Sequence, residues 1–194
     1  MKKVTIITGL SALFAVLLVY ACQSPSASNG TTEISADSLV KRGSYLVNAM
    51  GCDDCHTQMI MGPQGPEPDM ANRFAGHLAS NKLGPIDTST LSKGWMLFSL
   101  NMTASYGPWG ISYAANLTPS ESGIGNWTED QFLYAIRNGK YKGMKESRPL
   151  MPPMPWMMYK NLSDTDLKSI FAYLKTQKPV DNVVPAWVPL SEVK

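Results

Sequence analysis

Hydrophobic positions recur at helical spacing in three stretches of the chain, and each stretch begins at a polar capping residue. The first covers residues 35–50, with Ser35 able to cap it and with Leu39 and Leu46 on one face. A glycine inside a helix costs about 1 kcal/mol relative to alanine. Because Gly43 lies in the middle of this stretch, we expect a second helix to cross it closely.

The two other stretches lie in the second half of the chain. Thr128 and Gln131 form a capping box that predicts a helix ending near Gly139. Ser163 opens the last helix, which Pro179 stops. The inward positions are Phe132, Leu133, Ala135 and Ile136 in the former and Leu167, Ile170, Phe171 and Leu174 in the latter.

The region between these helices shows little periodicity. Residues 57–126 contain many prolines and glycines and are predicted to be mostly loop, with one or two helical turns over Trp95–Leu100 and a tight turn over Tyr106–Gly110. A loop this long is unusual in a compact domain, so we expect it to wrap a large apolar group. Residues 179–194 are expected to form an extended tail over the surface.

The N-terminus has the pattern of an export signal. Residues 1–21 carry Lys2 and Lys3 before an uncharged apolar stretch. Its end resembles a bacterial lipobox, in which Cys22 would be acylated, and residues 22–34 form a polar tether. The alternative is a retained membrane-spanning helix. Both interpretations place the folded domain on the periplasmic side of a bacterial cell envelope.

The composition narrows the function classes. Hydrophobic residues make up 44% of the chain and charged residues only 16%, which supports a real core. Without Lys2 and Lys3, the 17 basic residues become 15 and equal the 15 acidic residues. A formally neutral mature chain is not expected to bind nucleic acid.

Cys52, Cys55 and His56 form a C-x-x-C-H motif, the attachment signature of c-type haem. Two thiols at this spacing reach the two vinyl groups of one porphyrin, and the next histidine can coordinate the iron. A thioredoxin-type redox pair would need a βαβ setting. A zinc site would need further ligands, and the only other histidine is His77. The motif therefore predicts one covalently bound haem.

A second axial ligand is sought among the 12 methionines. The prolines at 152, 153 and 155 fix the backbone of residues 148–156. They predict that this segment, the methionine strap, is extended. Met154, with a proline on each side, is the favoured distal ligand. Met151 and His77 remain alternatives, and otherwise His77 is interpreted as a surface histidine or one near the haem propionates.

Basic residues gather just before this strap, namely Lys140, Lys142, Lys145 and Arg148. One interpretation is an ordinary solvated loop. The other is a charged rim around an exposed haem edge that attracts an acidic redox partner.

In order, these elements resemble a class I c-type cytochrome, and they are most similar to the single-haem domains of the cytochrome subunits of membrane-bound bacterial alcohol and gluconate dehydrogenases. The matching pieces are Gly51–Thr57, Asn116–Pro119, Gly123–Thr128, Pro152–Trp156, Leu162–Leu167 and Ala172–Leu174. The chain departs from those subunits in having one C-x-x-C-H, where they often have three, and in a long insert over residues 58–115.

The resemblance implies a mainly α class I cytochrome c fold over residues 35–178. It implies thioether bonds at Cys52 and Cys55, His56 as the proximal ligand and Met154 as the distal ligand. It also implies that the first and last helices cross near Gly43. The expected function is a single-electron carrier for redox partner proteins such as a dehydrogenase, an oxidase or a respiratory complex. The alternatives are a haem enzyme with a displaceable distal methionine and a sensor or structural haem domain.

Overall fold

The computed structural model describes residues 34–193. The expected leader, Cys22 and all of the tether except Ile34 lie outside the described residues. Within residues 34–193, no helix is both long and apolar enough to cross a membrane.

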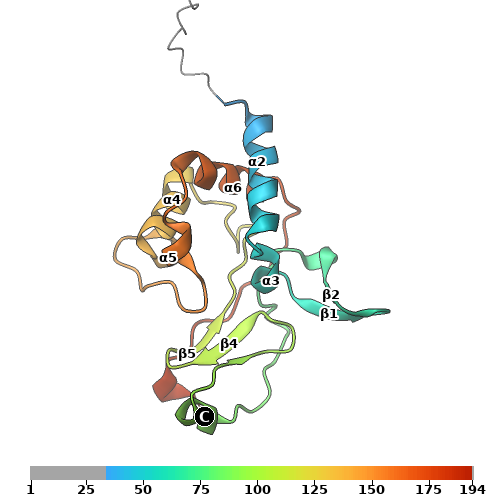
Figure 1. The fold of residues 1–194 in the computed structure, drawn as a ribbon, viewed down its shortest axis with the longest axis vertical. Coiled ribbons are helices and arrows are strands. Elements are labelled where there is room, and N and C mark those ends of the chain that lie inside the picture. Colours follow the sequence, from blue (N-terminus) through green and yellow to red (C-terminus); the bar gives the residue numbers. More distant parts are fainter. Residues whose placement is uncertain (1–33, 194) are drawn as a thin grey trace, which may run out of the picture. The chain divides into compact units, whose positions relative to one another are not determined.

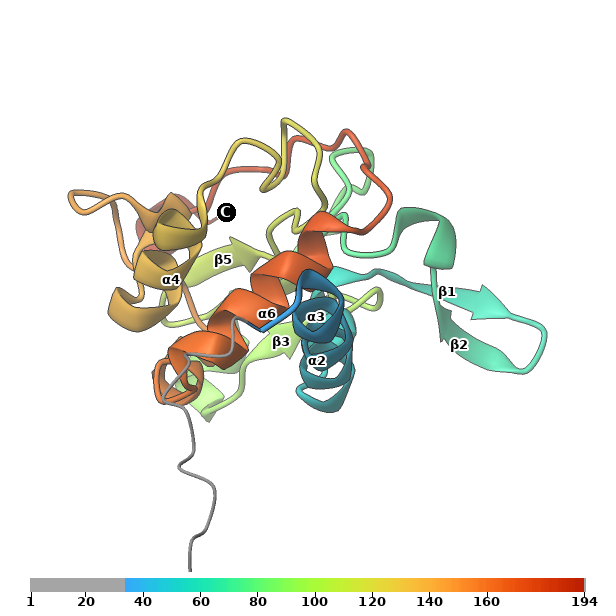
Figure 2. The same ribbon diagram turned by 90° about the horizontal axis from the view of Figure 1, so that it is seen from above.

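The crossing of the first and last helices organises the domain. Helix α2 spans Ala36–Ala49 and α6 spans Asp164–Lys175, and α6 runs across α2 in Figure 2. The caps predicted at their starts are confirmed, because Ser35 Oγ and Ser163 Oγ accept backbone N–H groups three residues onward. The predicted close approach at Gly43 is confirmed as well, since a Cβ there would overlap the backbone carbonyl of Ser169.

Helix α4 completes the apolar core. It spans Glu129–Asn138, with Thr128 Oγ1 accepting from the backbone N–H of Gln131 at 3.1 Å and Gly139 in the left-handed conformation at its end, as predicted. Two short helices, α3 (Cys52–His56) and α5 (Trp156–Tyr159), follow α2 and precede α6, respectively. The buried cluster comprises Leu46, Val47, Phe74, Ile124, Phe132, Ile136, Leu167, Ile170, Phe171, Tyr173 and Leu174.

The insert contains more regular structure than the sequence predicted. A hairpin pairs β1 (Met59–Gly62) with β2 (Gly65–Pro68), and a three-stranded antiparallel sheet has the order β3 (Leu97–Phe98), β4 (Ala104–Gly107) and β5 (Gly110–Tyr113). Figure 1 shows this sheet beyond the end of α2 that leads into α3. The helical turns expected over Trp95–Leu100 are wrong, because this segment contains strand β3. The tight turn over Tyr106–Gly110 is confirmed as the β4–β5 connection.

Four short 3₁₀ helices complete the helical structure of the described residues. These are η1 (Met70–Asn72), η2 (Thr88–Lys93), η3 (Tyr141–Gly143) and η4 (Leu190–Glu192).

The C-terminal tail over residues 179–193 has little regular structure besides η4, and it does more than cover the surface. Asn182 is buried, and its Nδ2 donates to the backbone oxygens of Ala75 at 2.8 Å and His77 at 3.0 Å. Further along, Trp187 Nε1 donates to the backbone oxygen of Trp109 at 2.7 Å. The tail therefore fastens two parts of the insert that are far apart in the sequence.

Candidate functional site

Helix α3 carries the whole C-x-x-C-H motif. Gly51 precedes it with φ of 67°, a left-handed conformation that glycine adopts readily and that turns the chain sharply from α2 into α3. Cys52 and Cys55 are free thiols, each half-buried. Burial and the neighbouring carboxylates of Asp53 and Asp54 raise the pKa of Cys52 to about 11. A catalytic redox pair needs a lowered thiol pKa, so this environment disfavours the thioredoxin-type alternative.

His56 is held in a single orientation by a backbone carbonyl. Its Nδ1 lies 2.7 Å from the backbone oxygen of Ala115. A carbonyl can only accept, so Nδ1 carries the proton and Nε2 keeps its lone pair, the arrangement that metal-ligating histidines use. Burial lowers the pKa of His56 and favours the neutral imidazole. The His56 backbone oxygen also accepts from the N–H of Gly76 at 2.8 Å, which fixes the main chain.

Arg73 ties α3 to the two crossing helices. Its guanidinium donates to both carboxylate oxygens of Asp53, at 2.9 and 2.5 Å. It also donates to Asn48 Oδ1 in α2 and to the hydroxyl of Tyr173 in α6, each at 3.0 Å. Burial by itself would raise the pKa of Asp53, but the hydrogen bonds from Arg73 and Thr57 outweigh it, so the pKa is lowered. Asp53 therefore stays ionised and holds α3 in place.

Met154 lies on a loop packed against the same core as Cys52. Both side chains are partly buried and contact the hydrophobic cluster of the helices. The loop is anchored at its start by the N–H of Leu150, which donates to Gly139 O at 2.7 Å. Where it leads into α5, a Cβ on Gly139 would overlap the indole of Trp156.

The strap is not uniformly extended, contrary to the prediction. Met154 N donates to Met151 O at 3.3 Å, so the chain turns at Pro152 and Pro153. Side-chain alternation along a strand therefore cannot choose between the two methionines. Of the two, Met154 is the one that packs against the core cluster.

His77 does not lie at the surface, so the interpretation as a surface histidine is wrong. Its side chain is fully buried and packs against the ring of Tyr113, with ring centroids 4.8 Å apart. Nδ1 lies 2.8 Å from Thr103 Oγ1, and Nε2 lies 3.3 Å from the backbone oxygen of Asn81. Both ring nitrogens thus face protein partners, which fits a structural histidine of the insert better than an iron ligand.

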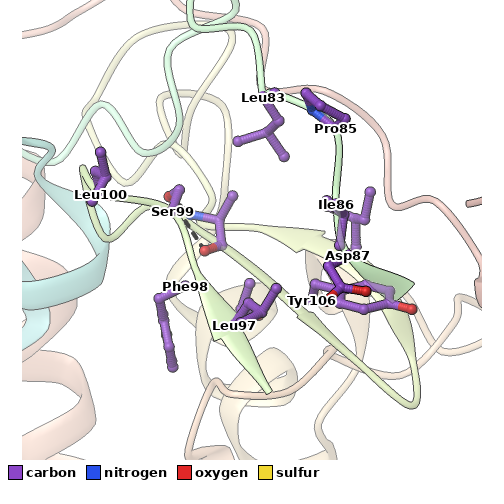
Figure 3. Close-up of a pocket in the computed structure, with 13 residues that line it drawn as sticks. Leu83, Pro85, Ile86, Asp87, Leu97, Phe98, Ser99, Leu100 and Tyr106 are labelled. Carbon is purple, nitrogen blue, oxygen red and sulfur yellow. Dashed lines mark hydrogen bonds between the residues drawn. The ribbon is translucent and has the colours of Figure 1, made fainter. Parts of the chain in front are cut away.

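A separate hollow of about 310 Å³ lies between residues 83–87 and the three-stranded sheet (Figure 3). Its lining is mainly apolar, with Leu83, Ile86 and Leu97 among its side chains. None of the predicted site residues lines it, so it is distinct from the C-x-x-C-H site.

The cytochrome c family model matches residues 40–178 of the chain, which include α3 and the methionine strap. The chain belongs to the cytochrome c family. This membership implies a covalent haem c, and the donor set fits such a group. Two unpaired thiols and a neutral imidazole lie on one short helix, and Nε2 of that imidazole has no hydrogen-bond partner among residues 34–193. The zinc alternative finds no support, because no group of three or more His, Cys, Asp or Glu side chains in this part of the chain could hold a metal ion.

Similar proteins are cytochrome subunits of dehydrogenases. The fructose dehydrogenase cytochrome subunit of Gluconobacter japonicus is 33% identical over 148 residues, covering 75% of this chain and 23% of the relative. The gluconate 2-dehydrogenase cytochrome c subunit of Pantoea cypripedii is 33% identical, covering 71% and 23%. The quinone alcohol dehydrogenase cytochrome c subunit of Gluconobacter oxydans (strain 621H) is 28% identical, covering 74% and 23%. The matched part of the chain thus spans about a quarter of each relative.

The sequence did not predict three residues that shape this cytochrome c site. Ala115 acts through its backbone oxygen, so its side chain carries no signal. Arg73 lies 20 residues from Asp53, and only the fold brings them together. Ser112 contacts the methionine strap from 40 residues away. A hairpin prediction around the turn at Tyr106–Gly110 could have placed Ser112 on a strand.

Proposed function

We propose that this chain is an exported, membrane-tethered cytochrome c with one haem, which carries single electrons between a dehydrogenase or respiratory complex and an acceptor. The observation that carries the proposal is His56, placed within the C-x-x-C-H helix with Nδ1 bonded to Ala115 O at 2.7 Å. That arrangement prepares Nε2 as a ligand.

The bound haem supplies a one-electron iron couple. Cys52 and Cys55 would hold it through thioether bonds, and Nε2 of His56 and the sulfur of Met154 would ligate its iron. A methionine–histidine pair raises the reduction potential and suits electron transfer. With both of these ligands bound, substrate and oxygen would find no open coordination site.

A single haem follows from the motif count. The chain has three cysteines, and only Cys52 and Cys55 form a C-x-x-C-H. The third, Cys22, is reserved for a lipid anchor. A relay of several haems within this chain would need further motifs, so onward transfer requires a partner protein.

The names of the relatives support a dehydrogenase as one partner, because three of them are cytochrome subunits of such enzymes.

The proposed membrane tether is tested by fractionating cells that express Cys22→Ser. A lipid anchor predicts that the processed variant leaves the membrane fraction. A variant that stays in the membrane at full length supports the retained helix instead.

The rival function is a haem enzyme in which substrate displaces Met154. The protein purified from membranes is titrated through its midpoint potential, and the oxidised form is examined for the absorption band that reports a methionine–iron bond. An electron carrier shows a reversible one-electron transition and that band, and Met154→Ala loses the band. A protein without the band that binds small exogenous ligands readily supports the enzyme.

A further inference from the structure

One short segment of the insert contacts the surroundings of both expected axial ligands. Ser112, in strand β5, donates its hydroxyl to the backbone oxygen of Pro152 at 2.6 Å, two residues before Met154. Ala115, three residues further along, accepts the proton on Nδ1 of His56. We propose that Ser112 is a positioning residue for Met154, so that the insert sets the strength of the distal ligand.

The contact with the Pro152 carbonyl, which can only accept, sets the direction of the hydrogen bonds around Ser112. Trp109 Nε1 lies 3.2 Å from Ser112 Oγ and can only donate to it. Ser105 Oγ lies 2.9 Å from Ser112 Oγ, from the directly opposite position on β4. Because Ser112 gives its own proton to Pro152, the Ser105 hydroxyl must donate as well. Trp109 and Ser105 therefore both donate to Ser112, and Ser112 donates to the strap at Pro152. Hydrogen bonds linked in this way polarise and strengthen one another.

The hydrogen bond from Ser112 to Pro152 lies between the two anchored ends of the strap. Leu150 is bonded to Gly139 at one end of the strap, and Trp156 packs on Gly139 at the other. Both of these anchors belong to α4 and its C-cap. Ser112 holds the middle, from a buried position on β5, which pairs with β4 on one side and is bridged to Val188 through Ile111 on the other. Loss of this bond would free the turn that presents Met154 while leaving both ends attached.

The inference rests on the proposed assignment of Met154 as the distal ligand, and its test uses the full-length, haem-loaded protein. The probe is imidazole, which must displace Met154 to reach the iron and so reports how readily the strap opens. Ser112→Ala is expected to bind imidazole about fivefold more tightly than the wild type, which corresponds to about 1 kcal/mol for one net hydrogen bond. Its midpoint potential should fall, because the methionine–iron bond weakens.

Ser105→Ala is the matched control, since it removes a buried hydroxyl from the same strand pair but leaves the bond to Pro152. It should stay within about twofold of the wild type, and Ser112→Thr, which keeps the hydroxyl, should do the same. The inference is overturned when Ser112→Ala behaves like the wild type, or when Ser105→Ala shifts as much as Ser112→Ala.

The same experiment separates this inference from the proposed function. A wild type that lacks the methionine–iron band, and whose Met154→Ala variant binds imidazole no more tightly, overturns the ligand assignment and with it the role of Ser112. A wild type with the band, together with an unchanged Ser112→Ala, overturns the role of Ser112 alone.

Discussion

Gly43 in α2 faces the backbone of Ser169 in α6 so closely that no side chain fits between them. A methyl group at this position would overlap the Ser169 carbonyl, which belongs to the helix backbone and cannot swing aside. The helix crossing next to the C-x-x-C-H helix α3 therefore depends on this glycine.

Gly43→Ala is expected to lower the free energy of unfolding by about 1–3 kcal/mol through overpacking, despite the better helix propensity of alanine. Denaturant unfolding measures the loss. Gly84→Ala is the control, because a Cβ at Gly84 meets no atom within 4 Å. Equal stability of Gly43→Ala and the wild type would contradict the close crossing.

The hydrogen bonds of the Arg73 guanidinium should also contribute to the stability of the fold. Lysine keeps the charge but cannot contact Asp53, Asn48 and Tyr173 at once, because it lacks the forked guanidinium. Since the pair with Asp53 is partly exposed, Arg73→Lys should cost about 2 kcal/mol, less than the loss of a fully buried pair. Tyr173→Phe, which removes one hydroxyl, should cost about 1 kcal/mol or less. Thermal unfolding of the two variants checks the order, and a reversed order would refute the central place of Arg73.

Acid should weaken the contact between α2 and α6. Arg42 Nε in α2 donates to Asp166 Oδ1 in α6 at 2.9 Å. This hydrogen bond lowers the pKa of the Asp166 carboxyl below its value in the unfolded chain. A lowered pKa in the folded state contributes stability above about pH 4, and this contribution is lost as the pH falls toward the folded value. Asp166→Asn should therefore show a shallower loss of unfolding free energy below about pH 4 than the wild type. Parallel curves for the two proteins would show that this carboxyl contributes nothing.

The basic loop, defined as residues 140–148, offers a test of partner docking. The ring of Tyr141 lies 3.8 Å from the Arg148 guanidinium carbon, and Lys140 Nζ donates to Ser147 O at 3.1 Å, so these two cations take part in the loop structure. Lys142 and Lys145 are exposed and are the ones available to attract an acidic partner.

If the basic loop attracts the partner, the rate of electron transfer should fall steeply between low salt and about 0.1 M salt, where the screening length shortens to about 10 Å. Lys142→Glu together with Lys145→Glu should slow the transfer and flatten the salt dependence. Lys41→Glu, on α2, serves as the control. A rate independent of salt in the wild type identifies this segment as an ordinary solvated loop.

The helices could be predicted because their signals are local. Ser35, Thr128 and Ser163 each bond a backbone N–H three residues onward, so cap and apolar spacing lie within one window of sequence. Strands β4 and β5 were missed because they are four residues each and contain serine and glycine instead of β-branched runs. The turn that joins them was predicted, but without a strand pattern on either side of it the hairpin was not recognised.

The site divides in the same way. The haem-binding role proposed for Cys52, Cys55 and His56 could be predicted from five adjacent residues, because the two thiols must match the spacing of the porphyrin vinyl groups and the histidine must follow directly. The orientation of His56 could not, since Ala115 lies 59 residues away and acts through its main chain. Contacts with backbone oxygens leave no mark on the identity of the residues that carry them, which is why the contacts of His56 with Ala115 and of Ser112 with Pro152 emerged only from the fold.

Mass spectrometry of the mature protein tests the central claim most directly. Protein purified from its native host should carry the mass of one haem that survives denaturation, and its peptide containing Cys52 and Cys55 should hold the adduct. The double variant Cys52→Ser with Cys55→Ser should lose it. A mature wild-type chain of unmodified mass at residues 52–56, with two thiols open to alkylation, would contradict the assignment of this protein as a haem-bearing electron carrier.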